Sequence, residues 1–130
     1  MSKEFNIEII SPDAKVFMGK SEEVVLPCYE GQSTILKDHI PFITYLRPGL
    51  IETGSGEKFY VEEGTVEFSD NNLLILSASA KNIKKIDKSE ISNMIIDSEQ
   101  KVSSEEITDK QKYILSYKID TLKSINQNNS

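Results

Sequence analysis

The sequence predicts an all-β sandwich, a flattened barrel of about eight to ten short strands, followed by a C-terminal α-helical hairpin. Up to residue 80, short apolar runs of alternating polarity are separated by Gly, Pro, Asn and Asp turn residues. From residue 87 onward, apolar residues recur every three or four positions, as on one helix face. Residues 1–80 carry 6 Lys+Arg and 13 Asp+Glu, whereas residues 81–130 carry 9 Lys and 8 Asp+Glu. We therefore expect a β-sandwich domain over residues 1–84 and a two-helix hairpin over residues 85–130.

The expected strands are runs rich in β-branched and aromatic residues that are bounded by turn residues. They are Phe5–Ile9, Val16–Met18, Glu23–Leu26, Ser33–Leu36, Phe42–Leu46, Leu50–Glu52, Phe59–Val61, Val66–Phe68 and Leu73–Ser77. The tripeptide Gly19-Lys20-Ser21 is expected to turn the chain. Because Pro27 cannot donate a ladder hydrogen bond, its strand is expected to end there or to lie at a sheet edge.

The two helices are indicated by capping residues and by apolar spacing. Asp87 and Glu90 match a capping box, with Ile86 and Ile91 at the positions of a hydrophobic staple. The run Ser103–Glu106 is expected to end the first helix and to offer a second capping signal. Residues at helical spacing define the apolar face of the second helix: Tyr113, Ile114, Leu115, Tyr117, Ile119, Leu122 and Ile125. Two amphipathic helices with a short link predict an αα-hairpin that ends near Ile125.

Composition excludes several classes of function. The acidic body argues against nucleic-acid binding, which requires clustered cations. The single cysteine, Cys28, cannot form an internal disulfide and suits a reducing compartment. No apolar run approaches the roughly 20 residues that span a bilayer, and no signal peptide is visible. These features predict a cytosolic chain, or one that lies peripherally on the cytosolic side of a membrane.

Catalytic and metal-binding patterns are also missing from the sequence. One His and one Cys cannot build a His-rich metal site, and no phosphate-binding Gly motif occurs. His39 beside Asp38 has three possible interpretations: a turn histidine that donates a hydrogen bond, a general base, or an interface residue. The adjacent pairs Glu22-Glu23 and Glu62-Glu63 would point to opposite faces of a strand, so neither suits acid–base catalysis. We expect no metal and no cofactor.

One stretch, from Glu30 to Leu50, carries most of the specific information. It contains Glu30-Gly31-Gln32, then Asp38-His39-Ile40-Pro41, and then Arg47-Pro48-Gly49-Leu50-Ile51. In order and spacing these segments resemble the epsilon subunit of the bacterial F-type ATP synthase. The segment Phe59–Glu67 also resembles a strand pair of that family. The chain departs from the family pattern at Asp38 and at Glu63, where the family usually has Gly.

The resemblance implies a β-sandwich with a C-terminal hairpin that acts as a non-catalytic rotor subunit of a proton-translocating ATP synthase. It implies contact with the c-ring through Glu30, Gly31 and Gln32, and with the gamma subunit around Asp38, His39 and Pro41. Cations of the second helix would meet the alpha and beta subunits, where hydrolysis would be regulated. These cations are Lys110, Lys112, Lys118 and Lys123, although a solvated helix face is an equally weighted interpretation. The implied location is peripheral, at the cytoplasmic face of the bacterial inner membrane.

The resemblance also bears on nucleotide binding. Some family members bind ATP at the start of the first helix, where Asp87 stands here. Glu90 replaces the Arg of that pattern and would repel phosphate, so we expect weak or no ATP binding and assign Asp87 to the helix cap. The alternative to a rotor subunit is a free-standing β-sandwich that senses a small ligand or nucleotide, which predicts a concave, partly apolar pocket.

Overall fold

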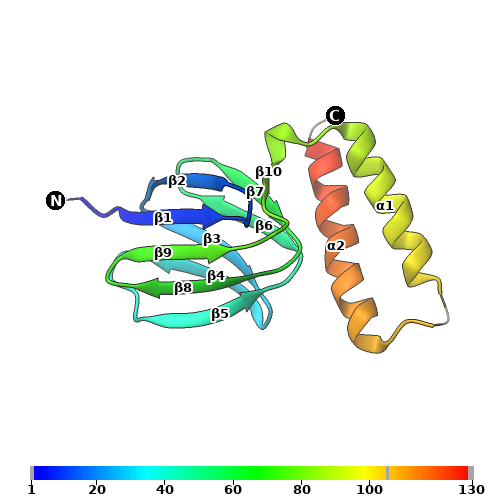
Figure 1. Ribbon diagram of the computed structural model, residues 1–130, viewed down its shortest axis with the longest axis horizontal. Helices are drawn as coiled ribbons and strands as arrows, with labels where there is room; N and C mark the ends of the chain where they lie inside the picture. Colours follow the sequence, from blue (N-terminus) through cyan, green and yellow to red (C-terminus); the bar gives the residue numbers. More distant parts are fainter. Residues whose placement is uncertain (1, 105, 129–130) are drawn as a thin grey trace. The chain divides into compact units, whose positions relative to one another are not determined.

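The computed structural model describes residues 2–104 and 106–128 (Figure 1). They form a strand-rich unit up to Asn82 and a helical unit from Ile83 onward. The strands are β1 (Phe5–Ile10), β2 (Lys15–Ser21), β3 (Glu23–Cys28), β4 (Gly31–Leu36), β5 (Phe42–Leu46), β6 (Gly49–Thr53), β7 (Lys58–Val61), β8 (Gly64–Ser69), β9 (Asn72–Leu76) and β10 (Lys81–Asn82). A 3₁₀ turn at Ile83–Lys85 precedes α1 (Lys88–Val102) and α2 (Asp109–Asn128).

The ten strands fold into a sandwich whose two halves approach a closed barrel. The first half has the strand order β4-β3-β6-β7-β10, and the second has the order β5-β8-β9-β1-β2, which Figure 1 shows side by side. Neighbouring strands are antiparallel except β1 and β9, which are parallel. Within the described residues, the halves are joined by one ladder pair, Cys28 with Leu46. The predicted fold class, a sandwich followed by two helices, is confirmed.

The core lies between the two halves and follows from the alternation within each strand. In β1, Phe5, Ile7 and Ile9 are buried, whereas Asn6 is exposed. The rings of Phe5 and Phe68 meet edge to face at 5.6 Å. Burial of one such aromatic or aliphatic side chain contributes about 1.5–3 kcal/mol. The core also takes residues from the other strands: Val24, Leu26, Cys28, Ile35, Leu46, Ile51, Phe59, Val61, Val66, Leu73 and Ile75.

Two local predictions within the strands were wrong. The tripeptide Gly19–Ser21 does not turn the chain but continues β2, where Ser21 pairs with Phe5. The strand at Glu23 neither ends at Pro27 nor lies at an edge, because β3 runs to Cys28 with neighbours on both sides. The Pro27 carbonyl accepts a hydrogen bond from the Arg47 N–H at 2.9 Å, so the residue still serves the ladder. Pro27 also requires Gly49 beside it, since a Cβ there would lie 2.5 Å from the Pro27 Cβ.

The helical unit has the predicted two helices, but its capping differs from the prediction. Asp87 is the N-cap residue of α1, yet its side chain makes no capping hydrogen bond, so the predicted capping box is wrong. A reciprocal box instead opens α2, where the Gln111 N–H donates to Thr108 Oγ1 at 3.1 Å and the Thr108 N–H donates to Gln111 Oε1 at 2.8 Å. Helix α1 ends at Val102, as the Ser103–Glu106 run predicted, and α2 continues past Ile125 to Asn128.

Candidate functional site

The loop between β4 and β5 carries the three residues predicted to contact a gamma subunit. Asp38 has φ 66°, in the left-handed region that Gly adopts most readily and that Asp tolerates better than most residues. This conformation explains why Asp38 can replace the Gly that the family resemblance leads us to expect. The His39 N–H donates to the Leu36 carbonyl at 3.2 Å and closes the turn. Pro41 is exposed, and β5 begins at the next residue.

The His39 side chain is exposed but held in a defined orientation. Its Nδ1 lies 2.8 Å from the Ile40 carbonyl oxygen, so Nδ1 carries a proton that it donates there. The ring packs edge to face on Phe42 at 5.1 Å and on Phe68 at 6.0 Å. The Asp38 carboxylate accepts a hydrogen bond from Asn71 at 2.9 Å rather than orienting the imidazole. The geometry favours an interface residue over a general base.

An exposed apolar surface lies beside His39 on the outer face of β5. Because Phe42 and Leu46 point toward the core, their neighbours Ile43 and Tyr45 point outward, and they are 73% and 64% exposed. Ile40, in the loop, is 74% exposed. We call Ile40, Ile43 and Tyr45 the β5 face. This surface was not predicted from the sequence, although apolar residues at both odd and even positions of the strand were a signal for it.

The β5 face continues across the neighbouring strands through cross-strand pairs. Tyr45 pairs with Thr65 of β8, which pairs with Leu76 of β9, and Leu76 is 46% exposed. Directly opposed residues present their side chains on the same face, so Leu76 extends the apolar surface. Isolated exposed apolar residues are ordinary on a protein, whereas a contiguous group of large ones indicates a partner.

The predicted c-ring residues form the turn from β3 into β4. Glu30 and Gln32 are exposed, and Gly31 has φ 147° with open space where a Cβ would stand. A cavity of about 370 Å³ lies beside them and is also lined by His39 and Phe42. The structure therefore brings the two predicted contact regions to one side of the sandwich. The Cys28 thiol at this cavity is buried, and burial raises its pKa, which makes it a poor nucleophile.

The four predicted lysines of α2 do not share one helix face. Lys118 lies three residues after Leu115 and four before Leu122, so it belongs to the apolar stripe and is partly buried. Lys123 is exposed, but its Nζ lies 3.7 Å from Glu99 of α1. Lys110 and Lys112 are exposed at the start of α2. The four lysines therefore form neither one solvated helix face nor one continuous binding surface.

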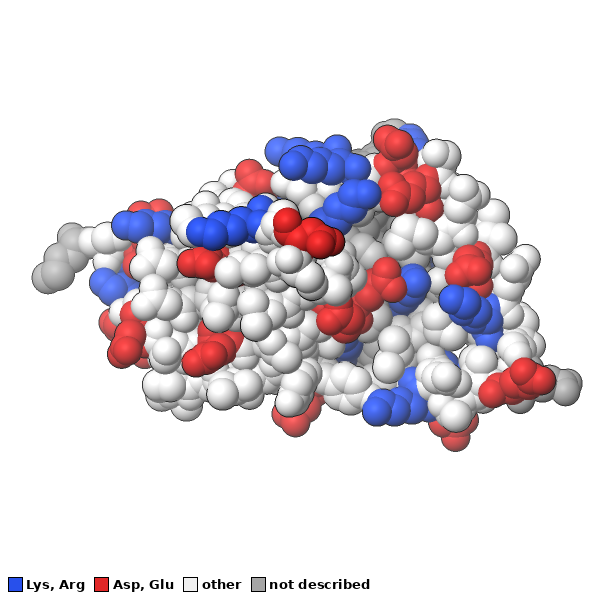
Figure 2. Space-filling view, viewed as in Figure 1, with Lys and Arg blue, Asp and Glu red and all other residues white. Residues whose placement is uncertain are grey.

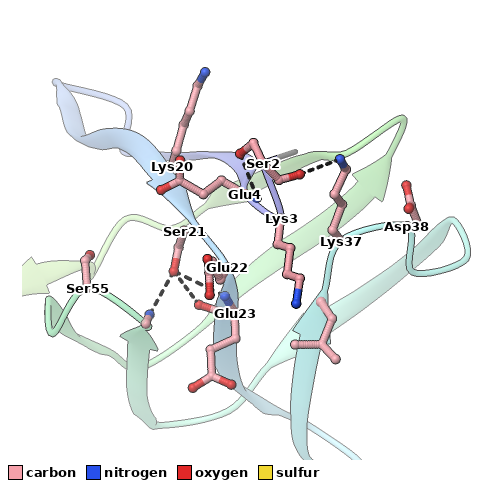
Figure 3. Close-up of a pocket in the computed structure, with 12 residues that line it drawn as sticks. Ser2, Lys3, Glu4, Lys20, Ser21, Glu22, Glu23, Lys37, Asp38 and Ser55 are labelled. Carbon is pink, nitrogen blue, oxygen red and sulfur yellow. Dashed lines mark hydrogen bonds between the residues drawn. The ribbon is translucent and has the colours of Figure 1, made fainter.

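A second cavity of about 720 Å³ opens at the end of the sandwich where the N-terminal segment, the β2–β3 link and the end of β4 meet (Figure 3). Its lining mixes Lys3, Lys20 and Lys37 with four acidic residues, Glu4, Glu22, Glu23 and Asp38. The buried Ser21 hydroxyl is satisfied, because it donates to the Glu23 carbonyl at 2.6 Å and accepts from the Gly54 N–H at 2.8 Å. This lining carries charges of both signs and includes one large apolar residue, Leu36, so it differs from the mostly apolar pockets that bind small molecules and does not favour a free-standing sensor.

The charged side chains on the face that Figure 2 shows do not support nucleic-acid binding. Figure 2 shows basic and acidic side chains interspersed on one face, without the large basic patch that nucleic-acid binding requires. Among the described residues, no group of three or more His, Cys, Asp or Glu side chains could hold a metal ion. No described helix is long and apolar enough to cross a membrane. Asp87, the doubtful nucleotide residue, is exposed at the start of α1.

Comparison with known proteins gives the chain a family. The family model described as the ATP synthase delta/epsilon chain β-sandwich domain matches residues 4–83. The ATP synthase epsilon chain of Pelagibacter ubique is 48% identical, with 97% of this chain and all of that chain covered. The ATP synthase epsilon chain of Nitratidesulfovibrio vulgaris is 38% identical, with 67% of each chain covered.

Solved structures with low sequence identity share the fold. A chain of the Euglena gracilis mitochondrial ATP synthase matches with a TM-score of 0.77 at 17% identity, over 95% of this chain and 82% of that one. A chain from the Tetrahymena thermophila central stalk and c-ring matches with a TM-score of 0.58 at 14% identity, over 96% of each chain. Together with the sequence matches, these findings assign the chain: it belongs to the ATP synthase delta/epsilon family, as an epsilon-type subunit of that complex rather than an enzyme in its own right.

Proposed function

We propose that the chain is a rotor component of a bacterial F-type ATP synthase that couples proton flow to ATP synthesis. In this proposal it binds the gamma subunit and the c-ring and lies peripherally at the cytoplasmic face of the inner membrane. The observation that carries the proposal is the β5 face beside the ordered His39. No bound nucleotide, metal or cofactor is part of the proposed role.

The β5 face and the His39 loop suit a protein partner. Ile40, Ile43 and Tyr45 are large side chains that lie mostly in solvent, and burying them would release apolar surface. Aromatic residues such as Tyr45 often dominate binding energy at the centre of an interface. His39 adds a ring that is already oriented, which lowers the ordering cost of binding. We therefore assign the gamma contact to His39, Pro41 and the β5 face. Asp38, whose carboxylate accepts a hydrogen bond from Asn71, has the role of shaping their loop.

The β3–β4 turn suits a polar contact with the c-ring. Glu30 and Gln32 are exposed on a turn where Gly31 has a positive φ that other residues resist. Gln32 supplies both a donor and an acceptor, so the contact can rest on hydrogen bonds as well as on the charge of Glu30. The position of the turn beside His39, on one cavity, allows both partners to be reached from the same side of the sandwich.

The helical unit supports a regulatory role of limited strength. Lys110 and Lys112 are free to meet an acidic segment of the alpha and beta subunits, whereas Lys123 would first have to leave Glu99. Exposed ion pairs of this kind contribute at most about 1 kcal/mol. At the start of α1, Glu90 stands in the first turn, and we propose that ATP binds there weakly or not at all.

The test is binding of the purified chain to the gamma subunit of the same ATP synthase, followed by size-exclusion chromatography and interferometry. We expect a stable complex, weakened about tenfold or more by Ile43→Lys and by His39→Glu, since an unpaired charge at an interface is costly. Ile96→Lys in α1 is the matched control, because Ile96 is also exposed, at 54%, and lies outside the proposed surface. A wild-type chain that stays monomeric beside gamma would overturn the proposal.

A further inference from the structure

Two turns that are far apart in the sequence are tied together by a reciprocal pair of hydrogen bonds. The Asp38 N–H donates to Asn71 Oδ1 at 2.7 Å, and the Asn71 Nδ2 donates to Asp38 Oδ1 at 2.9 Å. The two residues are 33 positions apart, one in the β4–β5 loop and the other in the β8–β9 turn. Because a backbone N–H only donates and a carboxylate only accepts, the amide of Asn71 has one orientation that satisfies both bonds.

Both residues hold backbone conformations that Gly would adopt more readily. Asp38 has φ 66° and Asn71 has φ 60°. Asp and Asn tolerate this region better than most residues but still less easily than Gly. Glycine at either position would make the turn without strain, yet it would lack the side chain that ties the turns together. The residue types at both positions therefore serve the link between the turns, and not only the turns themselves.

The link acts directly on His39, the next residue in the loop. The His39 ring packs on Phe68, which lies on the β8 strand that leads into the Asn71 turn. Asn71 thus holds the loop backbone, while Phe68 of the same hairpin supports the ring. The hydrogen bonds that His39 itself makes in the described structure, to the Leu36 and Ile40 carbonyls, are local to the loop and its strand end. The link and the packing of the His39 ring on Phe68 both connect this loop to the β8–β9 hairpin.

We propose that the Asp38–Asn71 pair is a strut that orders the His39 loop before a partner binds, and that Asn71 is a positioning residue for that contact. The inference rests on the proposed function only for the identity of the partner, the gamma subunit. Since a flexible loop must be ordered on binding, a chain without the strut binds more weakly even though no contact with the partner is removed. We expect a loss of about tenfold in affinity, from faster dissociation or slower productive association.

The experiment compares Asp38→Gly, Asn71→Gly and the double variant with the wild-type chain. Glycine keeps both turn conformations accessible, so these variants fold while losing the strut. We expect each single variant to weaken gamma binding about tenfold and the double variant to be no weaker than either, because the two residues act as one unit. Asp38→Asn keeps Oδ1 as acceptor and should bind like wild type. Asn72→Ala is the matched control, since it removes the exposed Asn6–Asn72 hydrogen bond of the same hairpin.

A second readout needs no partner. His39 is the single histidine in the sequence, so its imidazole proton resonances are unique in an NMR spectrum. In the free chain, the strut variants should move these signals toward the values of an unstructured peptide, whereas Asp38→Asn and Asn72→Ala should not. Unchanged His39 signals in Asp38→Gly and Asn71→Gly would overturn the ordering role, whatever the affinity of these variants for gamma.

The binding results separate the two proposals. If the wild-type chain does not bind gamma but the His39 signals respond as expected, the proposed partner is wrong and the strut still orders the loop. If Asp38→Asn loses as much affinity as Asp38→Gly with unchanged His39 signals, the carboxylate contacts gamma directly and the positioning role is overturned. Additive losses in the double variant would likewise show that Asp38 and Asn71 act separately.

Discussion

At the scale of single residues, Glu63 shows how one departure from a family pattern is accommodated. Its Oε1 accepts hydrogen bonds from the N–H groups of Ala78 and Ser79, at 3.0 and 3.2 Å, and from the Ser79 hydroxyl at 3.1 Å. Gly, which has no side chain, could not make these contacts. The carboxylate therefore fastens the segment that leaves β9 to the β7–β8 turn, just ahead of β10.

We predict that Glu63→Ala loosens this segment without affecting the rest of the sandwich. Hydrogen exchange at the amides of Ala78 and Ser79 should become at least about tenfold faster, since their acceptor is lost. The stability loss should be about 1 kcal/mol, at the low end for charge-assisted bonds because the site is exposed. Glu67→Gln, at an exposed acid within β8, is the control. Unchanged exchange at residues 78 and 79 would contradict the assigned role of the carboxylate.

Two buried side chains that can lose a proton, Cys28 and Tyr60, predict how the stability of the fold depends on pH. Burial raises the pKa of the Cys28 thiol, and burial together with the nearby Glu62 carboxylate raises the pKa of Tyr60. In the unfolded chain these groups ionise near about 8.5 and 10. The unfolded state therefore loses protons at a lower pH than the folded state. Their contribution to stability is fully present below the unfolded pKa values and is lost as the pH rises above them.

The corresponding prediction is that urea unfolding measured from pH 7 to 10.5 shows falling stability above about pH 8.5, and that Tyr60→Phe flattens the decline near pH 10. At pH 7 the same variant should be close to neutral, because the buried Tyr60 hydroxyl makes no hydrogen bond of good geometry among the described residues, although the Glu62 carboxylate is near it. Tyr45→Phe, at a tyrosine that is 64% exposed, is the control for removal of a tyrosine hydroxyl. An equal effect of both variants would rule out burial as the cause.

At the scale of elements, the two helix starts offer a matched comparison of capping. Thr108 and Gln111 form a reciprocal box, whereas the Asp87 side chain makes no capping bond. We predict that Thr108→Ala lowers stability by about 1 kcal/mol and speeds hydrogen exchange in the first turn of α2. Asp87→Ala should change stability by less than about 0.5 kcal/mol. Urea unfolding measures both stability losses. A larger loss for Asp87→Ala than for Thr108→Ala would show that these side-chain hydrogen bonds do not determine how much each cap stabilises its helix.

The strands also show which sequence patterns are sufficient to predict secondary structure. Strands such as Phe5–Ile10 were predictable because alternation is a local pattern that burial on one face imposes. Gly19–Ser21 was mispredicted because its composition signals a turn, while its pairing with β1 depends on residues more than ten positions away. Pro27 was mispredicted because its missing donor matters less than the pairs that β3 makes on both sides. Long-range pairing overrides local propensity in each case.

The candidate site was predictable only in part, for a similar reason. His39 and the Glu30–Gln32 turn could be named from residue types and spacing along the chain. To predict the β5 face, one must know which alternate residues of the strand point outward. To predict the role of Asn71, one must know which distant turn contacts Asp38. A sequence pattern gives positions along the chain, whereas a surface is assembled from several strands.

At the scale of the whole molecule, we predict that the sandwich folds without the helices. The members of the main core run from Phe5 to Ile75, and Ala80 packs against them, so a fragment ending at Lys85 retains that core. This fragment should unfold cooperatively in urea. Its midpoint should differ from that of the full chain only by the stability that the helical unit adds. A broad, non-cooperative transition would show that the sandwich depends on residues 86–130.

The last prediction concerns regulation by the helical unit, and it rests on the proposed function. To inhibit hydrolysis, α2 must present cations to the catalytic subunits, but only Lys110 and Lys112 are both exposed and free of a recorded pairing in the described structure. Lys118 lies on the apolar stripe of α2, and Lys123 is paired with Glu99. Exposed lysine contacts contribute at most about 1 kcal/mol each and are screened by salt.

Deleting residues 87–130 should therefore leave assembly and coupled synthesis intact and raise ATP hydrolysis by reconstituted complexes only a few-fold. Lys110→Ala with Lys112→Ala should reproduce most of that rise. Lys123→Ala should add little, because the loss of its contact with the catalytic subunits is offset by release from Glu99. A rise of about tenfold or more on deletion corresponds to about 1.4 kcal/mol and exceeds what exposed lysine pairs supply. That result would mean that apolar residues of α2 leave the hairpin and bind the catalytic subunits themselves.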